Sequence, residues 1–488
     1  MDKIKKIIPK SLFQFFQPAY HYLLAALGAL IYRFPSRQIY VVGITGTKGK
    51  TTTTEIVNYI FEEAGFKTAI ASTLRFKIGD KEKRNLFKMT MPGRFFMQKF
   101  LREAVDRSSQ IAIIEMTSEG AKQFRHKFMN IDALIFTNLA PEHIESHGSY
   151  AKYLEAKLSI ARQLESPPEK LSRKVWPSEA KETPARLDGM SGRRGLFERA
   201  FPAGIVKKTI IANVDDPEGE KFLSLNIEDK IPYSLKDATG IKTDENGSSF
   251  QIGKVVIHSK LPGIFNVSNM LGAIALGRFF QIPDETIKKA IEKIDFVRGR
   301  MEKITLDGSP PNPPAGGGGF DVVVDYAHTP DSLEAVYRAY ENHKKICVLG
   351  NTGGGRDKWK RKAMGSIADK YCDEIILTNE DPYDEDPLSI VEAIKEGVEK
   401  KQVEIIMDRR KAIREAIKKA RALRFDFAKA SPDKQAKIAV LITGKGTDPY
   451  IMEANGKKTP WDDASVVREE LQRIMNPARP NHSGRQES

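Results

Sequence analysis

The feature that most constrains the fold is an apolar run that ends in a glycine-rich turn and continues as a helical pattern. Residues 39–45 read IYVVGIT, residues 46–50 read GTKGK, and a helix-like segment follows from residue 51. A strand, a tight loop and a helix in this order present backbone N–H groups and the positive end of the helix dipole to a phosphate. The pattern therefore predicts an α/β fold with a nucleotide-binding loop.

The side chains of this loop suit phosphate and magnesium chemistry. Lys50 is expected to reach the terminal phosphates of ATP, and the Thr51 hydroxyl is expected to bind Mg²⁺. Ile44 stands where the strict phosphate-loop pattern has its first glycine. The predicted ATP-binding residues of the loop are Gly46, Thr47, Lys48, Gly49, Lys50, Thr51 and Thr52.

Further apolar segments predict two doubly wound units. Strands are expected at 111–116 and 132–139 in the first unit, with helix-like segments between them. The second unit is expected to contain strands at 321–327, 344–350, 373–378 and 437–443. The predicted fold is α/β, with a central P-loop ATPase domain built on a parallel-rich sheet and a C-terminal Rossmann-like domain. The predicted division is an apolar segment at 1–38, the central domain at 39–299, the C-terminal domain at 300–475 and a disordered tail at 476–488.

Two polar stretches interrupt these patterns. Residues at about 165–204 and 308–320 are rich in proline and glycine and have no apolar periodicity. Such composition does not bury enough apolar surface to order a chain, so we expect surface insertions there.

The N-terminal segment is apolar, but its sequence does not predict a membrane span. Its uninterrupted apolar part, residues 23–32, is shorter than the roughly 20 residues that cross a bilayer, and no signal-peptide cleavage site stands out. A helix packed on the body of the protein is favoured. The alternative for residues 11–34 is an interfacial membrane helix with basic flanks, or a contact with a partner chain.

The net charge of the chain narrows the class of partner. The net charge of +14 fits either an acidic surface such as nucleic acid or membrane, or a basic protein that binds anionic nucleotides. Because Lys and Arg are spread along the chain, the second reading is favoured and no nucleic-acid partner is expected.

The two cysteines, Cys347 and Cys372, form no CxxC pair, so we expect buried thiols in a reducing compartment rather than a disulfide or zinc site.

Several strings resemble the Mur ligases. The loop GTKGKTT is similar to theirs, and equally to the loop of folylpolyglutamate and cyanophycin synthetases, which share this ATPase domain. Residues 137–160 resemble a second Mur segment, with Glu142 in place of the usual Asp. The resemblance runs from about Val41 to Leu471 without the two insertions. It implies an ADP-forming ligase that activates a carboxylate as an acyl phosphate and joins it to an amine.

The resemblance also implies a metal site beside the loop. Glu115 ends a predicted strand, where a carboxylate can hold Mg²⁺ against ATP. His143 is implied as ligand of a second Mg²⁺, with Asn138 as support. Lys157 matches the family's carbamylated lysine, in which captured CO₂ makes a cation into an anionic ligand; a solvated helix lysine is the alternative. The implied catalytic residues are Lys50, His143 and Lys157, and the implied metal ligands are Thr51, Glu115, His143 and Lys157.

Other matched segments imply further ATP contacts. Asn266 and Asn269, in LPGIFNVSN, would bond the adenine ring, since a carboxamide donates and accepts on one base edge. Arg300 would contact the phosphates. In VDYAHTPDSLE, Asp325 would take the ribose hydroxyls and His328 would lie near the phosphates.

The string DYAHTP and the segment at 349–365 resemble the tripeptide-forming branch, MurE. Its implied substrates are a UDP-MurNAc-dipeptide-like carboxylate and an amino acid, in peptidoglycan precursor synthesis. Arg356 would hold the carboxylate of the incoming amino acid. The implied contacts to the muramoyl-peptide are Thr90, Thr117, Ser118 and Arg125.

The positions that would select the amino acid depart from this branch. Glu380-Asp381-Pro382-Tyr383 stands where diaminopimelate-adding members carry DNPR, and Tyr383 cannot form the bidentate salt bridge of an Arg. The acidic pair Glu380 and Asp381 favours lysine or a similar diamino acid, although both could be helix caps or solvated. Gly444 and Asp448, in a string similar to the family's GKGHE, complete the implied substrate-binding residues.

Only about 40 residues precede the loop, where this branch carries a UDP-sugar-binding domain. Uridine recognition is therefore expected to be reduced, missing or supplied by another chain. Two alternatives stay open: a ligase of the same superfamily acting on a substrate without UDP, and an inactive ATP-binding subunit. Retention of Lys50, Glu115 and Lys157 argues against the inactive subunit. We expect a cytoplasmic monomer, with a peripheral place at the inner face of the membrane as the alternative.

Overall fold

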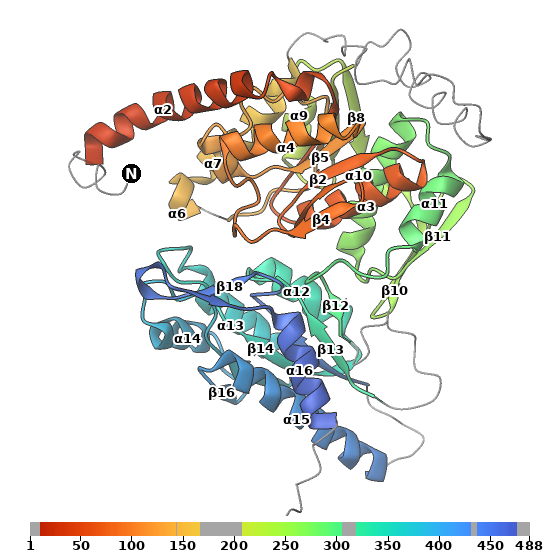
Figure 1. The fold of residues 1–488 in the computed structure, drawn as a ribbon. Coiled ribbons are helices and arrows are strands. Elements are labelled where there is room, and N and C mark those ends of the chain that lie inside the picture. The colour runs from red at the N-terminus through yellow and green to blue at the C-terminus, as the bar shows by residue number, and fades with distance from the viewer. Residues whose placement is uncertain (1–9, 143, 166–206, 305–318, 431–436, 476–488) are drawn as a thin grey trace, which may run out of the picture. The chain divides into compact units, whose positions relative to one another are not determined.

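The computed structural model describes residues 10–142, 144–165, 207–304, 319–430 and 437–475 (Figure 1). The two predicted insertions and the tail lie almost wholly outside these ranges. The chain forms two compact units, which divide near residue 294. Met1–Thr243 and Gly247–Ile294 make the first unit, and Asp244–Asn246 and Asp295–Ser488 make the second.

The first unit is built on an eight-stranded sheet with the order β4-β3-β2-β5-β1-β6-β7-β8. Strand β1 lies between β5 and β6 and runs parallel to both. All six residues of β1 are buried, which explains why it reads as a continuous apolar run in the sequence. The strands are β1 (Tyr40–Thr45), β2 (Thr68–Ala71), β3 (Arg75–Ile78), β4 (Lys81–Arg84), β5 (Ile111–Glu115), β6 (Ala133–Phe136), β7 (Thr209–Asn213) and β8 (Asp229–Tyr233).

Helices pack against this sheet, and α10 and α11 both contact α3. A separate antiparallel sheet, which the sequence did not predict, contains β9 (Thr239–Asp244), β10 (Gly247–Ile252) and β11 (Val255–Ser259). The helices are α2 (Lys10–Ile31), α3 (Lys50–Glu63), α4 (Arg94–Asp106), α5 (Ser118–Lys122), α6 (Ile144–His147), α7 (Tyr150–Ala161), α9 (Gly219–Leu223), α10 (Ile264–Phe279) and α11 (Asp284–Glu292), with 3-10 turns η1 (Pro35–Arg37), η2 (Arg162–Glu165) and η5 (Leu235–Asp237).

The N-terminal segment forms helix α2, which packs on α4 as the favoured reading expected. Tyr22 of α2 packs edge-on against Phe128, with 5.0 Å between the ring centroids. Among the described residues, the apolar helices all fall short of what a bilayer crossing needs.

The second unit contains a six-stranded sheet with the order β12-β13-β17-β14-β15-β16. It is parallel except for β12, and its four longest strands are the four that the sequence predicted. The α/β fold class is therefore confirmed. The strands are β12 (Glu302–Lys303), β13 (Asp321–Val324), β14 (His343–Leu349), β15 (Glu374–Leu377), β16 (Val403–Ile405), β17 (Lys437–Ile442) and the hairpin β18 (Tyr450–Met452) and β19 (Lys458–Pro460). The helices are α12 (Pro330–Ala339), α13 (Lys360–Tyr371), α14 (Pro387–Lys395), α15 (Arg409–Ala430), α16 (Asp463–Met475) and the turn η6 (Ala454–Gly456).

The cysteines correct one expectation. Cys347 and Cys372 form a disulfide, with an S–S distance of 2.08 Å and 6.1 Å between their Cα atoms, so the prediction of two thiols is wrong. Cys347 lies within β14, and Cys372 follows α13 immediately before the neighbouring strand β15. Helix α13 returns the chain to the strand beside β14, which brings together two residues that are 25 positions apart in the sequence.

A buried ion pair joins α15 to α16 in the second unit. Arg409 donates two hydrogen bonds to Asp463, at 2.8 and 2.6 Å, and a third to the Thr443 carbonyl at 2.9 Å. Both charged side chains are almost fully buried. Loss of one partner would leave the other charge buried without compensation, which costs far more than an exposed pair contributes.

We therefore expect Asp463→Ala to lower the free energy of unfolding by about 3–5 kcal/mol, because it leaves the Arg409 guanidinium unpaired. Urea unfolding followed by tryptophan fluorescence measures the change. The matched control is Glu469→Ala, which removes an exposed partner of Arg410 and should cost less than about 1 kcal/mol. Equal costs for the two variants would contradict the special role of the buried pair.

Candidate active site

The loop between β1 and α3 has a backbone that two glycines make possible. Gly49 caps α3 with a left-handed φ of +79°. A Cβ at Gly49 would lie 2.1 Å from Asn269 Oδ1, and a Cβ at Gly46 would lie 2.0 Å from Thr137 Oγ1. The loop is thus drawn tightly against the start of α10 and the end of β6, and only glycine allows both approaches.

Replacing Gly49 with alanine should weaken nucleotide binding by about tenfold or more, because the new methyl group displaces Asn269 and the left-handed backbone costs about 1–2 kcal/mol. Isothermal titration with ATP measures the effect. Gly79→Ala is the matched control, since Gly79 has a φ of +57° but nothing within 4 Å of its Cβ position. A loss of affinity shared by both variants would mean that backbone strain alone is responsible.

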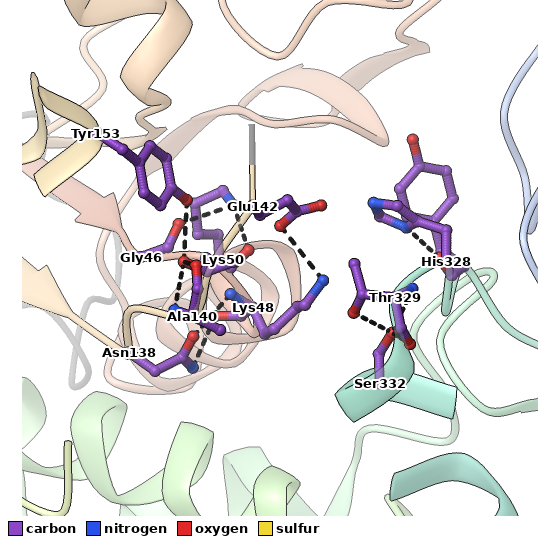
Figure 2. Close-up of polar contacts among 12 residues, drawn as sticks. Gly46, Lys48, Lys50, Asn138, Ala140, Glu142, Tyr153, His328, Thr329 and Ser332 are labelled. Carbon is purple, nitrogen blue, oxygen red and sulfur yellow. Dashed lines mark hydrogen bonds and ion pairs between the residues drawn. The ribbon is translucent and has the colours of Figure 1, made fainter. Parts of the chain in front are cut away.

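Hydrogen bonds from the end of β6 hold the loop in place (Figure 2). Asn138 accepts the Lys48 backbone N–H at 2.8 Å and donates to the Lys48 carbonyl at 3.2 Å. The Thr137 hydroxyl donates to the same carbonyl at 2.7 Å, and Thr47 shares a 2.9 Å hydrogen bond with the Tyr153 hydroxyl. Asn138 is therefore a support for the loop backbone.

Three lysines meet at this loop. Lys50 Nζ donates to the carbonyls of Gly46 and Thr47, at 3.0 and 2.9 Å. Lys157 Nζ donates to the same Gly46 carbonyl at 2.6 Å, whereas Lys48 forms an ion pair with Glu142 at 3.3 Å. Figure 2 shows the side chains of Lys48 and Lys50 at the loop, with Tyr153 beside it.

Lys157 lies in an environment that disfavours its charge. The side chain is fully buried, and its Nζ lies 4.9 Å from the centroid of the Tyr153 ring. Burial, and secondarily the charge of Lys50, lowers the pKa of Lys157 well below its usual range. A neutral amine is the form that reacts with CO₂, so this environment suits a carbamate and does not suit a solvated helix lysine.

A carboxylate and a hydroxyl face each other at the ends of β5 and the loop. The Thr51 hydroxyl donates to Glu115 Oε2 at 3.1 Å. Thr73 donates to the same carboxylate through its backbone N–H at 2.9 Å and its hydroxyl at 3.0 Å, and its hydroxyl also shares a 2.8 Å hydrogen bond with Thr90. Thr73 was missed in the sequence, where the only signal is its place directly after the short strand β2.

This pair of oxygen ligands fits Mg²⁺ bound together with a nucleotide. Mg²⁺ commonly takes one or two protein oxygens and fills its other positions with phosphates and water. Within the described ranges, no three His, Cys, Asp or Glu side chains form a metal-binding group. Thr51 and Glu115 are therefore compatible with Mg²⁺ on ATP phosphates, and His143 lies outside the described residues.

The predicted adenine contacts lie on α10, next to the loop. Both are buried; Asn266 donates to the Pro262 carbonyl at 2.8 Å, and Asn269 donates to Asn266 Oδ1 at 3.2 Å. Since Asn269 also approaches Gly49, the structure brings this pair and the phosphate-binding loop together. Thr52 is buried on the first turn of α3.

The predicted peptide contacts gather around α5. Thr117 caps this helix, and Ser118 is hydrogen-bonded to His147 at 3.1 Å. Arg125 donates to the Met91 carbonyl, beside Thr90, and to Gln123 at 2.7 Å. Arg125 is a half-buried cation in this region, and a guanidinium can bind the carboxylates of a peptide.

In the second unit, Asp325 organises the chain around the end of β13. Its two oxygens accept the backbone N–H groups of Met301 at 2.7 Å and Ala327 at 2.6 Å. The Arg300 guanidinium lies 4.6 Å from the centroid of the Tyr326 ring, and His328 Nδ1 donates to the Tyr326 carbonyl at 2.7 Å. Three predicted nucleotide contacts thus occupy one small region of this unit.

Glu380 and Asp381 differ sharply in their surroundings. Lys445 Nζ donates to both oxygens of Asp381 at 2.9 Å, and to Asp448 at 2.8 Å. Glu380 accepts a hydrogen bond from Thr352 at 2.8 Å, but within the described part of the chain its Oε2 atom has no hydrogen-bond partner. Burial, reinforced by Asp381, raises the pKa of Glu380. A cation brought to Oε2 would therefore satisfy a buried acceptor.

The unpartnered oxygen of Glu380 faces glycine backbone at the carboxyl ends of the strands. A Cβ at Gly444 would lie 2.4 Å from Oε2. Arg356 lies over the Tyr383 ring at 5.4 Å and donates to its hydroxyl at 3.4 Å. The carboxyl ends of the strands are the usual ligand-binding edge of such a sheet.

Comparison with protein families gives two matches. The Mur ligase middle domain matches residues 44–172 and 194–277, and the glutamate ligase domain of Mur ligases matches residues 299–446. The matches span both structural units.

Individual proteins agree with this result. The chain is 32% identical over 460 residues to the UDP-N-acetylmuramoyl-L-alanyl-D-glutamate--2,6-diaminopimelate ligase of Aquifex aeolicus. This match covers 91% of the chain and 81% of the relative. The enzyme of the same name from Bacillus licheniformis is also 32% identical, over 458 residues, 91% of the chain and 81% of the relative.

Solved structures share the fold at lower identity. A structure of a UDP-N-acetylmuramoyl-L-alanyl-D-glutamate--2,6-diaminopimelate ligase has a TM-score of 0.53 at 23% identity, and the match covers 90% of this chain and 79% of that one. Folylpolyglutamate synthase of Mycobacterium tuberculosis complexed with ADP and AMPPCP has a TM-score of 0.59 at 15% identity, with 93% and 95% covered. At these identities the structures support the fold alone.

Proposed function

The chain belongs to the Mur ligase family, and on that basis we propose that it joins an amino acid to a UDP-MurNAc-dipeptide-like carboxylate in peptidoglycan precursor synthesis. It is an ATP-dependent amide ligase. The observation that carries the proposal is the gathering of Lys50, Thr51, Glu115 and Lys157 around one loop, in a chain whose diaminopimelate-ligase relatives match it over 91% of its length.

The reaction has two steps in this proposal. A carboxylate oxygen of the peptide attacks the γ-phosphorus of ATP and the bond to the bridging oxygen breaks, which gives an acyl phosphate and ADP. The amine then attacks the acyl carbon and phosphate leaves, with one proton released. Lys50 neutralises charge on the transferred phosphoryl group, and the loop amides hold the other phosphate oxygens. Arg125 and the threonine hydroxyls near it orient the peptide.

The metal requirement rests on the oxygens beside the loop. Thr51 and Glu115 would hold one Mg²⁺, and His143 with a carbamate on Lys157 would hold a second. Mg²⁺ supplies positive charge against the phosphate oxygens. The Lys157 amine would gain its carbamate by attack on CO₂, forming an N–C bond and releasing one proton to solvent. Burial, which lowers the pKa of Lys157, supports this step.

The incoming amine is proposed to be a diamino acid, with lysine as the leading hypothesis. The relatives are named for 2,6-diaminopimelate, but Tyr383 lacks the fixed charge that would hold a distal carboxylate. Because Asp381 is already paired with Lys445, Glu380 supplies the available carboxylate oxygen for an ammonium group. Arg356 would bind the carboxylate of the same amino acid.

The enzyme is proposed to act in the cytoplasm as a monomer. Residues 11–34 are the segment through which it would touch the inner face of the membrane or a partner chain.

The deciding assay is phosphate release from ATP with UDP-MurNAc-dipeptide and each of a panel of amino acids. Release that requires both the dipeptide and lysine is expected. Release with diaminopimelate alone would overturn the lysine hypothesis and leave the ligase intact. Release with a muramoyl-peptide that lacks UDP, and none with the UDP form, would move the function to a substrate without UDP.

Glu380→Gln should raise the KM for the amino acid about 10- to 100-fold, because it removes a charged acceptor from the ammonium group. The KM for ATP should not change. Asp386→Asn is the matched control: it removes the same charge at an exposed helix cap, where asparagine caps equally well. An unchanged amino-acid KM in Glu380→Gln would exclude this residue from the amine site.

A further inference from the structure

Helix α2 carries a row of exposed apolar side chains on one face. The exposed side chains along it are spaced by four and three residues, which places them on one side of the helix. Each of them is between 43% and 67% exposed. They are Phe16, Tyr20, Leu23, Leu27, Leu30 and Ile31. A continuous exposed apolar strip of this kind marks an interaction surface.

The opposite face of α2 packs against α4, so the exposed strip points away from this contact. Ala25 and Ala29 are buried, and a Cβ at Gly28 would lie 3.7 Å from the Phe95 Cα and the Gln98 side chain, an ordinary van der Waals contact with α4. Small residues thus let the helix sit directly on α4. The contact of α2 with α4 therefore leaves the apolar strip on the side of α2 that faces away from the first unit.

Charge at the two ends of the helix has one sign. After Asp2 the next acidic residue in the chain is Glu55. Basic residues lie before and after the apolar strip, and none lies within it. They are Lys3, Lys5, Lys6, Lys10, Arg33 and Arg37. This arrangement complements a surface that is apolar in depth and anionic at its edge.

Two occupants could cover such a strip, and the charge pattern separates them. A second copy of the helix in a coiled coil normally brings charged residues alongside the apolar seam, where they set the pairing. Here the positions beside the seam within α2 are Gln17, Ala19, Leu24 and Ala26, and none of them is charged. An anionic bilayer instead accepts apolar side chains below its headgroups, tyrosine rings at the headgroup level and basic residues at the phosphates.

We propose that α2 docks this enzyme on the surface of an anionic lipid bilayer, with the strip in the acyl boundary and the basic ends at the headgroup phosphates. This deepens the peripheral placement proposed above and does not depend on which amino acid is added. A lipid contact of this kind holds the protein at the membrane without crossing it.

Vesicle flotation tests the proposal with the full chain. Binding is expected to vesicles of phosphatidylcholine mixed with phosphatidylglycerol, and to be weaker by at least about tenfold to phosphatidylcholine alone, since each basic residue near an anionic surface adds about 1 kcal/mol. Leu23→Glu with Leu27→Glu should abolish binding. Leu388→Glu is the matched control, because Leu388 is a similarly exposed leucine in the second unit and its change should leave binding intact.

Two further measurements complete the test. Arg33→Gln with Arg37→Gln should weaken binding to anionic vesicles about 25-fold. Phosphate release without vesicles should be equal in wild type and the leucine variants, which shows that they fold and separates this proposal from the catalytic one.

No binding to anionic vesicles would overturn the proposal. A dimer in sedimentation velocity that Leu23→Glu with Leu27→Glu dissociates, without vesicle binding, would assign the strip to a second copy.

Discussion

Replacing Lys50 with methionine is expected to lower the rate of ATP-dependent phosphate release by about 10²- to 10³-fold while the protein stays folded. The Lys50 ammonium lies over the loop, held by the carbonyls of Gly46 and Thr47. Both acceptors lie in the loop three and four residues before Lys50, so the side chain can turn to a phosphate without any change in the fold. Methionine keeps most of the volume and removes the charge.

Single-turnover phosphate release gives the rate, and circular dichroism confirms the fold. Lys48→Met is the matched control two residues away. Because the Lys48 ammonium is taken by Glu142, its loss should cost less than about tenfold. If Lys48→Met were the more damaging change, Lys48 rather than Lys50 would be the lysine on the transferred phosphate.

The sequence predicted those elements whose residues are buried on both sides. Strands β1, β13 and β17 read as unbroken apolar runs because helices cover both faces of a parallel sheet. The sheet of β9, β10 and β11 was missed for the opposite reason. Strand β9 has almost no buried residue, so neither an alternating nor a continuous apolar pattern is present.

The residues of the candidate site also divide into those that the sequence predicted and those that it did not. The loop and the carboxylate of Glu115 were predictable, because a phosphate site needs glycine, lysine and a strand end in a fixed order. Contacts between residues that are far apart in the sequence were not predictable. Thr73 comes to Glu115 from the turn between β2 and β3, Lys445 comes to Asp381 across 64 residues, and Cys372 returns to Cys347 through a crossover helix. No local pattern encodes such pairs.

Replacing Lys157 with methionine is expected to lower the ligation rate by about 10²- to 10³-fold. The carbamate signal of the protein is expected to disappear in the same variant. The residue is buried, its amine is held at 2.6 Å from the Gly46 carbonyl, and burial lowers its pKa well below the usual range. This direction favours the neutral amine, the form that reacts with CO₂, relative to an ordinary lysine. Isotope-labelled bicarbonate followed by carbon NMR reports the carbamate, and phosphate release reports the rate.

Lys208→Met is the matched control, because Lys208 is an equally buried lysine in the same unit. Its ammonium is paired with Asp132 at 2.9 Å and also donates to the Ile131 carbonyl at 2.7 Å, so it is not expected to react with CO₂. This variant should lower stability, because it removes a buried ion pair, but keep the labelled carbamate. A carbamate signal that persists in Lys157→Met, or one that disappears in Lys208→Met alone, would assign the modification to another lysine and leave Lys157 as an uncharged support of the loop.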